Sequence, residues 1–210
     1  NLAGNEARYL AECISTTFVS SVGPFVDRFE AMVAASAGAR EAVVTSSGTT
    51  GLHAALTALG VGPGDLVVLP SFTFIASANA IAHCGAMPWL FDVDPDSWTL
   101  DPALVARTLG AETERRGDGL VHRPTGRRVA AMLPVYTLGM PADMDAIMAT
   151  ARDFRLPIVA DAAAALGARY KARAIAALGA HLTVFSFNGN KTVTAGGGGV
   201  VAGDDPTLCA

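Results

Sequence analysis

Short apolar runs alternate with helical segments along most of this chain, and this alternation restricts its fold more strongly than any other feature. Runs with the length and residue types of strands cover 42–45, 66–69, 87–93, 129–135, 157–160 and 182–187. Segments with helical character separate most of these runs. Strands that alternate with helices in this way favour a mainly parallel sheet wrapped by helices. The alternation therefore predicts a three-layer α/β fold.

Local signals place several element boundaries. Pro24 suits the first position of a helix, and Gly38 is placed to end it. In the same way, Pro141 is expected to start a helix. The stretch 110–128 carries charges of both signs without apolar periodicity, which favours a solvated insertion over a subunit contact. The stretch 167–180 is expected to be loop-like.

Composition and charge narrow the class of function. A chain of 210 residues with 51% hydrophobic content can bury a sizeable core in one large domain. A net charge of -4 argues against a nucleic-acid surface. The three cysteines and four histidines are scattered, so neither a disulfide framework nor a metal site is suggested. Polar residues interrupt the most apolar region, 66–91, which argues against a membrane span. We expect a cytoplasmic protein that acts on small molecules.

The glycine-rich stretch FSFNGNKTVTAGGGG places a lysine in a polar turn between two apolar runs. Two of the 15 lysine and arginine residues are lysines, Lys171 and Lys191. A partly desolvated lysine can lose its proton near neutral pH and attack a carbonyl, whereas arginine stays protonated. Lys171 lies in a polar segment typical of a solvated surface charge. Lys191 precedes four consecutive glycines, 196–199, which let backbone approach a ligand closely. Lys191 is therefore the candidate for covalent chemistry.

A second candidate site is the turn between the run 42–45 and the helical segment 51–59. A strand, a turn of small residues and a helix N-terminus together expose backbone N–H groups and the positive end of a helix dipole. Such a turn can hold a phosphate at Gly48 to Thr50. The alternative is an ordinary capped helix with Ser47 as its N-cap.

Two further candidates follow predicted strands, at the edge where open α/β sheets bind ligands. Phe72 or Phe74 could stack on a planar ring, or either could belong to the core. Asp161 ends the run 157–160, and the residues after it are small and apolar. A charge there is costly to bury without a cationic partner, and the alternative is a helix-capping aspartate.

Together with the hydroxyl of Ser186, these residues match what pyridoxal phosphate (PLP) requires. Its phosphate needs N–H and hydroxyl donors, its ring a stacking face, its pyridine nitrogen an anion, and its aldehyde a lysine. One chain offers all of these groups, and none of them requires a metal. The sequence therefore predicts a PLP site.

The motifs SSGTTGLHAAL, VGPGDLVVLPSFTFIASANAI, PADMDAI, DAAAALGA and FSFNGNKTVTAGGGG resemble the DegT/DnrJ/EryC1/StrS family of sugar aminotransferases, a branch of the aspartate-aminotransferase-like fold. The resemblance covers nearly the whole chain and implies the large domain of PLP fold type I. It implies that Lys191 forms the Schiff base, Asp161 pairs with the pyridine nitrogen and Phe74 stacks on the ring. The implied phosphate ligands are Gly48, Thr49 and Ser186.

The resemblance also implies partners and a wider architecture. A homodimer with the site at the subunit interface is expected, together with a smaller C-terminal domain that residues 1–210 do not contain. VSSVG, PTGRR and FSFNGNK look most like enzymes that aminate nucleotide-linked 4-keto-6-deoxy sugars for legionaminic acid or bacillosamine pathways. The expected amino donor is an amino acid, by resemblance glutamate.

The chain departs from the family pattern at several positions. Ala164 replaces a usual Gln or Glu near the cofactor or substrate, Tyr136 replaces a frequent His, and Ala180 replaces the Asp of a Gly-Asp pair. Ala164 keeps open a cofactor-binding regulator without turnover. A pyridoxamine-dependent sugar dehydratase of the same family is a further alternative. Lys191 argues against the dehydratase, because those enzymes typically carry His at that position.

Overall fold

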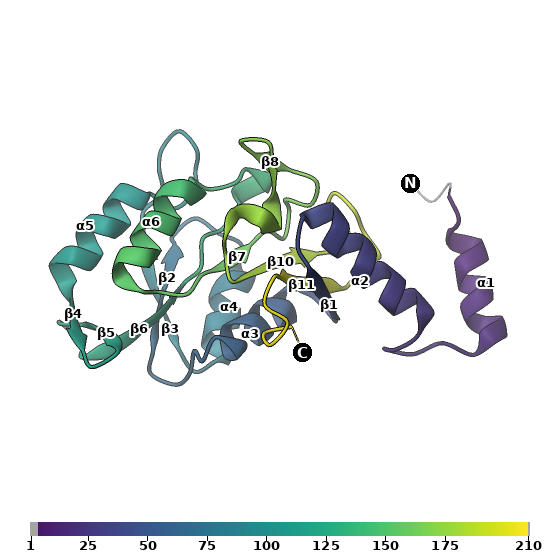
Figure 1. Ribbon diagram of the computed structural model, residues 1–210, viewed down its shortest axis with the longest axis horizontal. Helices are drawn as coiled ribbons and strands as arrows, with labels where there is room; N and C mark the ends of the chain where they lie inside the picture. The colour runs from purple at the N-terminus through teal and green to yellow at the C-terminus, as the bar shows by residue number, and fades with distance from the viewer. Residues whose placement is uncertain (1–3, 210) are drawn as a thin grey trace.

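The computed structural model describes residues 4–209 and places a continuous sheet at the centre of the molecule (Figure 1). One part of the sheet contains β1 (Glu41–Thr45), β11 (Gly199–Gly203), β10 (Leu182–Ser186) and β7 (Val159–Asp161), in that order. The other contains β6 (Arg127–Met132), β2 (Leu66–Pro70) and β3 (Met87–Phe91). Parallel bridges from Met132 to Ile158 and from Val135 to Asp161 join the two parts. β11 runs opposite to β1 and β10, and the other pairings among these strands are parallel. The predicted mainly parallel sheet is confirmed.

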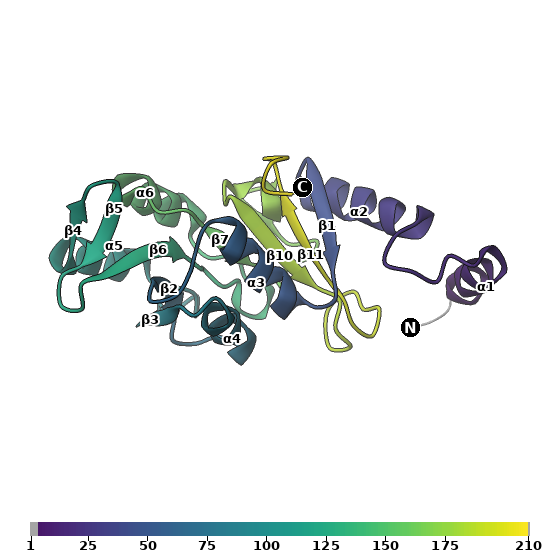
Figure 2. The ribbon, with the colours of Figure 1, turned by 90° about the horizontal axis from the view of Figure 1, so that it is seen from below.

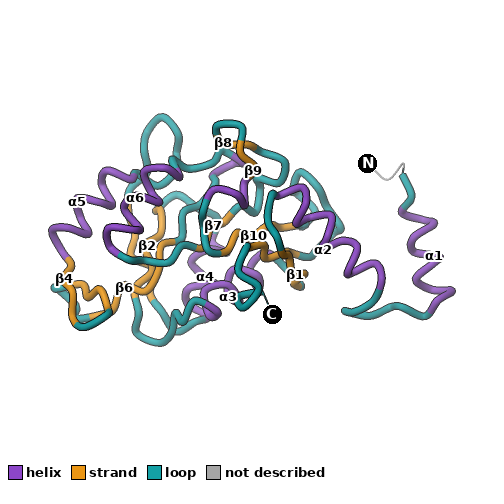
Figure 3. Tube along the Cα trace, in the orientation of Figure 1, coloured by secondary structure: helices purple, strands orange, loops and turns teal. Residues whose placement is uncertain are grey.

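Helices cover both faces of this sheet (Figure 2, Figure 3). One face packs against α3 (Gly48–Ala58) and α4 (Ile75–His83), and the other against α2 (Pro24–Ala37), α5 (Pro102–Glu112) and α6 (Met144–Phe154). Successive residues of a strand point to opposite faces. Val67 and Leu69 accordingly pack with α3 and α4, whereas Leu66 and Val68 join the core on the other face. The predicted three-layer α/β fold is confirmed.

The ends of the helices follow their capping residues. α2 begins at Pro24 and ends before Gly38, which has a φ of 77°, as predicted. The prediction for Pro141 is wrong, because α6 begins at Met144. Asp143 is its N-cap, and the carboxylate accepts a hydrogen bond from a backbone N–H of the first turn at 3.3 Å. A side chain that satisfies an otherwise unpaired N–H thus sets the start of α6.

The stretch 110–128 holds a β-hairpin, and most of its charged residues are exposed, as expected of a solvated insertion. Its strands are β4 (Thr113–Arg116) and β5 (Gly119–His122), and β5 also pairs with the first half of β6. Thr113, Leu120 and His122 are buried, while Arg115 and Arg116 are exposed. The two strands could not be predicted from the sequence, because few of the hairpin positions carry the apolar side chains that form an alternating pattern.

The stretch 167–180 differs from the expected loop. It contains β8 (Arg169–Tyr170), β9 (Arg173–Ala174) and the 3-10 helix η2 (Ile175–Leu178). Lys171 and Ala172 form the hairpin turn with φ of 47° and 65°, a conformation that usually selects Gly or Asn. Because neither residue is typical of such a turn, the sequence does not predict a hairpin there.

α1 (Glu6–Thr16) stands apart from the rest of the molecule (Figure 1). This helix lies wholly within the described residues and buries none of its side chains. Its contact with α2 runs through Tyr9, whose ring lies 5.3 Å from that of Phe25 and whose hydroxyl accepts a hydrogen bond from Arg28 at 3.2 Å.

A short 3-10 helix, η1 (Thr137–Gly139), follows β6. Within residues 4–209, no helix has the length and apolar character needed to cross a membrane.

Candidate active site

The carboxyl ends of four parallel strands meet at one edge of the sheet, and ligands bind along this edge in open α/β sheets. The predicted site residues follow those strand ends. Gly48 comes after β1 and Phe74 after β2, while Asp161 ends β7 and Ser186 ends β10. The loop from β10 to β11 carries Lys191 at the same edge. The topology thus gathers residues that lie far apart in the sequence.

Gly48 opens α3 directly beside Ser186. A Cβ atom at Gly48 would lie 2.9 Å from the Cβ of Ser186, so this approach requires glycine. The Ser47 hydroxyl accepts a hydrogen bond from the Thr50 N–H at 3.1 Å, and Thr50 Oγ1 accepts one from the Ser47 N–H at 3.0 Å. Ser47 is therefore the N-cap of α3, which confirms the predicted capped helix. The positive end of the α3 dipole, where Thr49 is part of the first turn, lies beside the Ser186 hydroxyl.

Glycines bring the lysine loop back against the start of α3. Gly196 and Gly198 have φ of 82° and 102°, in the region that favours glycine. A Cβ atom at Gly199 would lie 2.5 Å from the carbonyl oxygen of Ser47, which leaves no room for a side chain. Gly199 thus packs against the backbone of Ser47, and this contact fixes the end of the loop that carries Lys191.

Lys191 and Phe74 come together at this edge. The Lys191 amine lies 5.9 Å from the centroid of the Phe74 ring, at the outer range of a cation–π contact. Phe74 is 72% exposed, so the alternative that it belongs to the core is wrong. Lys171, by contrast, is exposed and its amine lies 2.6 Å from the carboxylate of Asp145. It is a surface charge, as predicted.

Asp161 is buried at the same edge, with 5% of its surface exposed. Its Oδ2 accepts a hydrogen bond from Ser77 Oγ at 2.7 Å, and its Oδ1 accepts one from the Ala163 N–H at 3.1 Å. Burial raises the pKa of this carboxyl above its usual value, although both hydrogen bonds and the positive charge of Lys191 oppose the rise. β7 leads into turns rather than a helix, so the helix-capping alternative is wrong.

Comparison with known proteins identifies the family. The profile of the DegT/DnrJ/EryC1/StrS aminotransferase family matches residues 1–210. The chain belongs to this family. It is 42% identical over 209 residues to a GDP-perosamine synthase of Caulobacter vibrioides, which covers 100% of this chain and 52% of that protein. A GDP-perosamine synthase of Escherichia coli O157:H7 is 35% identical over 208 residues, covering 99% and 52%. The chain thus spans about half the length of these relatives.

Solved structures of aminotransferases share the fold. The aminotransferase from Psychrobacter cryohalolentis matches with a TM-score of 0.85 at 31% identity, over 100% of this chain and 49% of that one. NtdA from Bacillus subtilis, with bound cofactor PMP, matches with a TM-score of 0.81 at 27% identity, over 97% and 42%. These likenesses confirm the predicted PLP fold type I architecture.

In this member of the DegT/DnrJ/EryC1/StrS family, Ser77 is a site residue that the sequence analysis missed. It is fully buried, and its hydroxyl lies between Asp161 and Thr73, whose Oγ1 is 2.8 Å from Ser77 Oγ. The sequence feature that could have indicated Ser77 was a small polar residue in an apolar helix, three positions after Phe74. That signal is weak, because the contact with Asp161 spans 84 positions of the chain.

Ala164, where the family usually has Gln or Glu, lies on the turn after β7. A Cβ atom at Gly139 would lie 2.8 Å from the Ala164 carbonyl oxygen, and Gly139 has a φ of 88°. Close packing therefore fixes the backbone of this turn, while the methyl side chain adds no polar group.

Across the part of the chain that the structure describes, no cluster of three or more His, Cys, Asp or Glu residues could hold a metal ion.

Proposed function

We propose that this chain is the cofactor-binding part of a PLP-dependent aminotransferase, which moves an amino group from an amino acid to a nucleotide-linked 4-keto-6-deoxy sugar. The proposal depends on one observation above all: an amine, an exposed aromatic ring and a buried carboxylate meet at a single sheet edge. These groups belong to Lys191, Phe74 and Asp161. Family membership and relatives named GDP-perosamine synthase support the sugar-nucleotide class.

The residues at this edge fit PLP chemically. The N-terminus of α3 and the Ser186 hydroxyl offer donors for a phosphate, and the missing side chain of Gly48 lets them lie together. Phe74 offers an exposed ring face, and Asp161 offers a buried anion. When bound, PLP supplies an aldehyde that condenses with amines and a ring that withdraws electrons from the adjacent carbon.

Each residue then has a distinct role. In the loaded enzyme, the Lys191 amine would hold the cofactor through its aldehyde, and a donor amine that replaced it would free Nζ to act as a general base. Nζ would then take the proton from the donor's α-carbon and deliver it to the cofactor carbon that had carried the lysine. Asp161 would stabilise the proton on the ring nitrogen, and Phe74 would offer its ring face for stacking. Backbone N–H groups of Gly48 and Thr49 and the hydroxyl of Ser186 would bind the phosphate.

Borohydride reduction of the PLP-loaded protein tests the lysine assignment, because it fixes the cofactor to the amine it has engaged. We expect peptide mapping to find the label on Lys191. Lys191→Ala should lose the label and slow amine transfer by about 10² to 10⁴-fold, the usual worth of a general base. Lys171→Ala is the matched control and should keep both. A label on Lys171, or full turnover by Lys191→Ala, would contradict the proposal.

The proposal includes a glutamate donor, a cytoplasmic location, a smaller C-terminal domain and a homodimer with the site at its interface, all from the family resemblance. Apolar side chains around the site support the interface. Phe72, Phe74, Trp98 and Val193 are 49%, 72%, 52% and 50% exposed. The rings of Phe72 and Trp98 contact each other with centroids 5.8 Å apart, and a contiguous exposed apolar patch is typical of an interaction site. The choice among nucleotide sugars, including those of the legionaminic acid and bacillosamine pathways, rests on sequence resemblance.

Ala164 favours one alternative, a cofactor-binding regulator without turnover. Its methyl group leaves the turn after Asp161 without the polar side chain that the family usually has there. An assay with an amino-acid donor and a keto-sugar acceptor separates the two functions. Bound cofactor without amine transfer would favour the regulator, whereas release of a 2-oxo acid supports the aminotransferase.

A further inference from the structure

Two hydroxyl groups lead from the half-buried end of the β2–α4 connection to the carboxylate of Asp161. Ser77 Oγ lies 2.7 Å from Asp161 Oδ2, and Thr73 Oγ1 lies 2.8 Å from Ser77 Oγ. Ser77 is fully buried and Thr73 is half-buried. Ser77 sits in the first turn of α4, and Phe74 is the N-cap of that helix. The hydroxyl chain therefore belongs to the same turn as the exposed ring.

An ionised Asp161 sets the direction of these hydrogen bonds. A carboxylate only accepts, so Ser77 gives its single hydroxyl proton to Asp161 Oδ2. Ser77 Oγ then has lone pairs to offer, and Thr73 donates to it. The 2.8 Å contact is shorter than the 3.3 Å contact from Thr73 Oγ1 to the Phe74 carbonyl, which agrees with this direction. Both protons point along the chain toward the carboxylate and stabilise its negative charge.

Other elements contribute less to the ionised form. The Ala163 N–H binds Oδ1 from the turn after β7, and Lys191 in the β10–β11 loop is the charged side chain that acts on Asp161 among the described residues. Neighbouring Ala162 and Ala165 are buried and apolar. A carboxylate in such surroundings takes up a proton unless donors stabilise the anion.

We infer that Ser77, supported by Thr73, is a positioning residue that keeps Asp161 ionised and holds its carboxylate in one orientation for the ring nitrogen of the cofactor. The part of this inference that concerns the cofactor rests on the proposed function. Because Ser77 and Phe74 share one turn of α4, that turn places both the ring face and the anion. A change in the turn would disturb the two contacts together.

Carbon-13 NMR of the Asp161 carboxyl, followed against pH in protein without cofactor, tests the inference, with Asp161→Asn to assign the signal. Ser77→Ala should move the titration midpoint to higher pH, and Thr73→Val should move it in the same direction by less. Thr73→Ser keeps the hydroxyl and should leave the midpoint unchanged. Thr57→Val removes a hydroxyl from the neighbouring helix α3, so it is the control and should also leave the midpoint unchanged. An unchanged midpoint in both Ser77→Ala and Thr73→Val would overturn the inference.

The PLP-loaded protein gives a second measurement. The pH dependence of its visible absorbance should differ between Ser77→Ala and wild type, and Thr57→Val should match wild type. Borohydride labelling separates this inference from the proposed function. If neither lysine is labelled while the Asp161 midpoint still moves, the proposed function fails and the control of the Asp161 charge stands. If Lys191 is labelled and the midpoint does not move, the function stands and the inference is overturned.

Discussion

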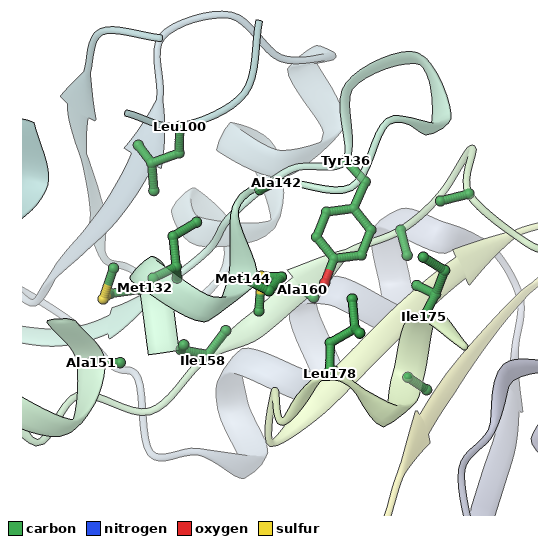
Figure 4. Packing of buried hydrophobic residues seen from close by; sticks show 14 of the residues in the cluster. Leu100, Met132, Tyr136, Ala142, Met144, Ala151, Ile158, Ala160, Ile175 and Leu178 are labelled. Atoms are coloured by element: carbon green, nitrogen blue, oxygen red, sulfur yellow. The ribbon is translucent and has the colours of Figure 1, made fainter. Parts of the chain in front are cut away.

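At the scale of single residues, Tyr136 conflicts most with its surroundings. Its hydroxyl has no hydrogen-bond partner among the described residues, and the ring packs between Ala160, Ile175 and Leu178 (Figure 4). Burial raises the pKa of this hydroxyl above its ordinary value. A buried polar group without a partner carries a desolvation cost. We expect Tyr136→Phe to stabilise the fold by about 1 kcal/mol in urea unfolding.

Tyr170→Phe is the matched control, because the Tyr170 hydroxyl is exposed to solvent and donates to Asp143 at 2.8 Å. Its loss should be neutral or slightly destabilising. A clear loss of stability in Tyr136→Phe would mean that the Tyr136 hydroxyl has a partner after all.

Residue types alone could predict part of the site. Lys191 was one of two lysines, and Asp161 was a carboxylate among alanines, so each was conspicuous by its chemistry. Ser77 was not conspicuous, since its importance depends on a partner 84 positions away. Hydrogen bonds of this kind follow from tertiary packing, which a local pattern does not encode.

At the scale of elements, the β4–β5 hairpin and β6 are held to the turn before β2 by Arg128 and Asp65. Arg128 Nη2 lies 2.5 Å from Asp65 Oδ2, and Nε donates to Oδ1 at 2.9 Å. Burial alone would raise the pKa of Asp65, but the hydrogen bonds from Arg128 and the Gly62 N–H, with the Arg128 charge, lower it overall. This forked geometry makes the pair stronger than an ordinary surface ion pair. Arg128 belongs to a polar stretch and Asp65 to a glycine-rich turn, and neither sequence pattern predicts that the two residues form an ion pair.

Arg128→Ala should lower the free energy of unfolding at pH 7 by roughly 2 kcal/mol, because it leaves a buried carboxylate without its partner. The wild-type pair contributes stability above the unfolded pKa of about 3.9, and this contribution is lost as pH falls through the lowered folded pKa. The difference between wild type and Arg128→Ala should therefore shrink below about pH 4. Arg116→Ala, which breaks an exposed pair with Glu114, is the control and should cost under about 0.5 kcal/mol. A difference that persists unchanged at pH 3 would contradict the assigned role.

At the scale of the whole molecule, the alternation of apolar runs and helices predicted the layers but not the strand order. β11 comes last in the chain and enters between β1 and β10, where it is antiparallel to both. Pairing between segments this far apart in the sequence leaves no local signal. The position of β11 nevertheless matters for the site, since it returns the Lys191 loop to the N-terminus of α3.

The separation of α1 from the body bears on assembly. An isolated helix of 11 residues is marginal in water, and here Leu10 and Ile14 expose 65% and 72% of their surface on one side of it. A second copy of the chain that covered Leu10 and Ile14 would stabilise this helix, in agreement with the proposed homodimer. Sedimentation velocity should then show a dimer that Leu10→Ser with Ile14→Ser shifts toward monomer, with the core fold retained. Met87→Ser, at an exposed apolar position on the amino end of β3, should leave the dimer intact. A double variant that stays fully dimeric would exclude α1 from the interface.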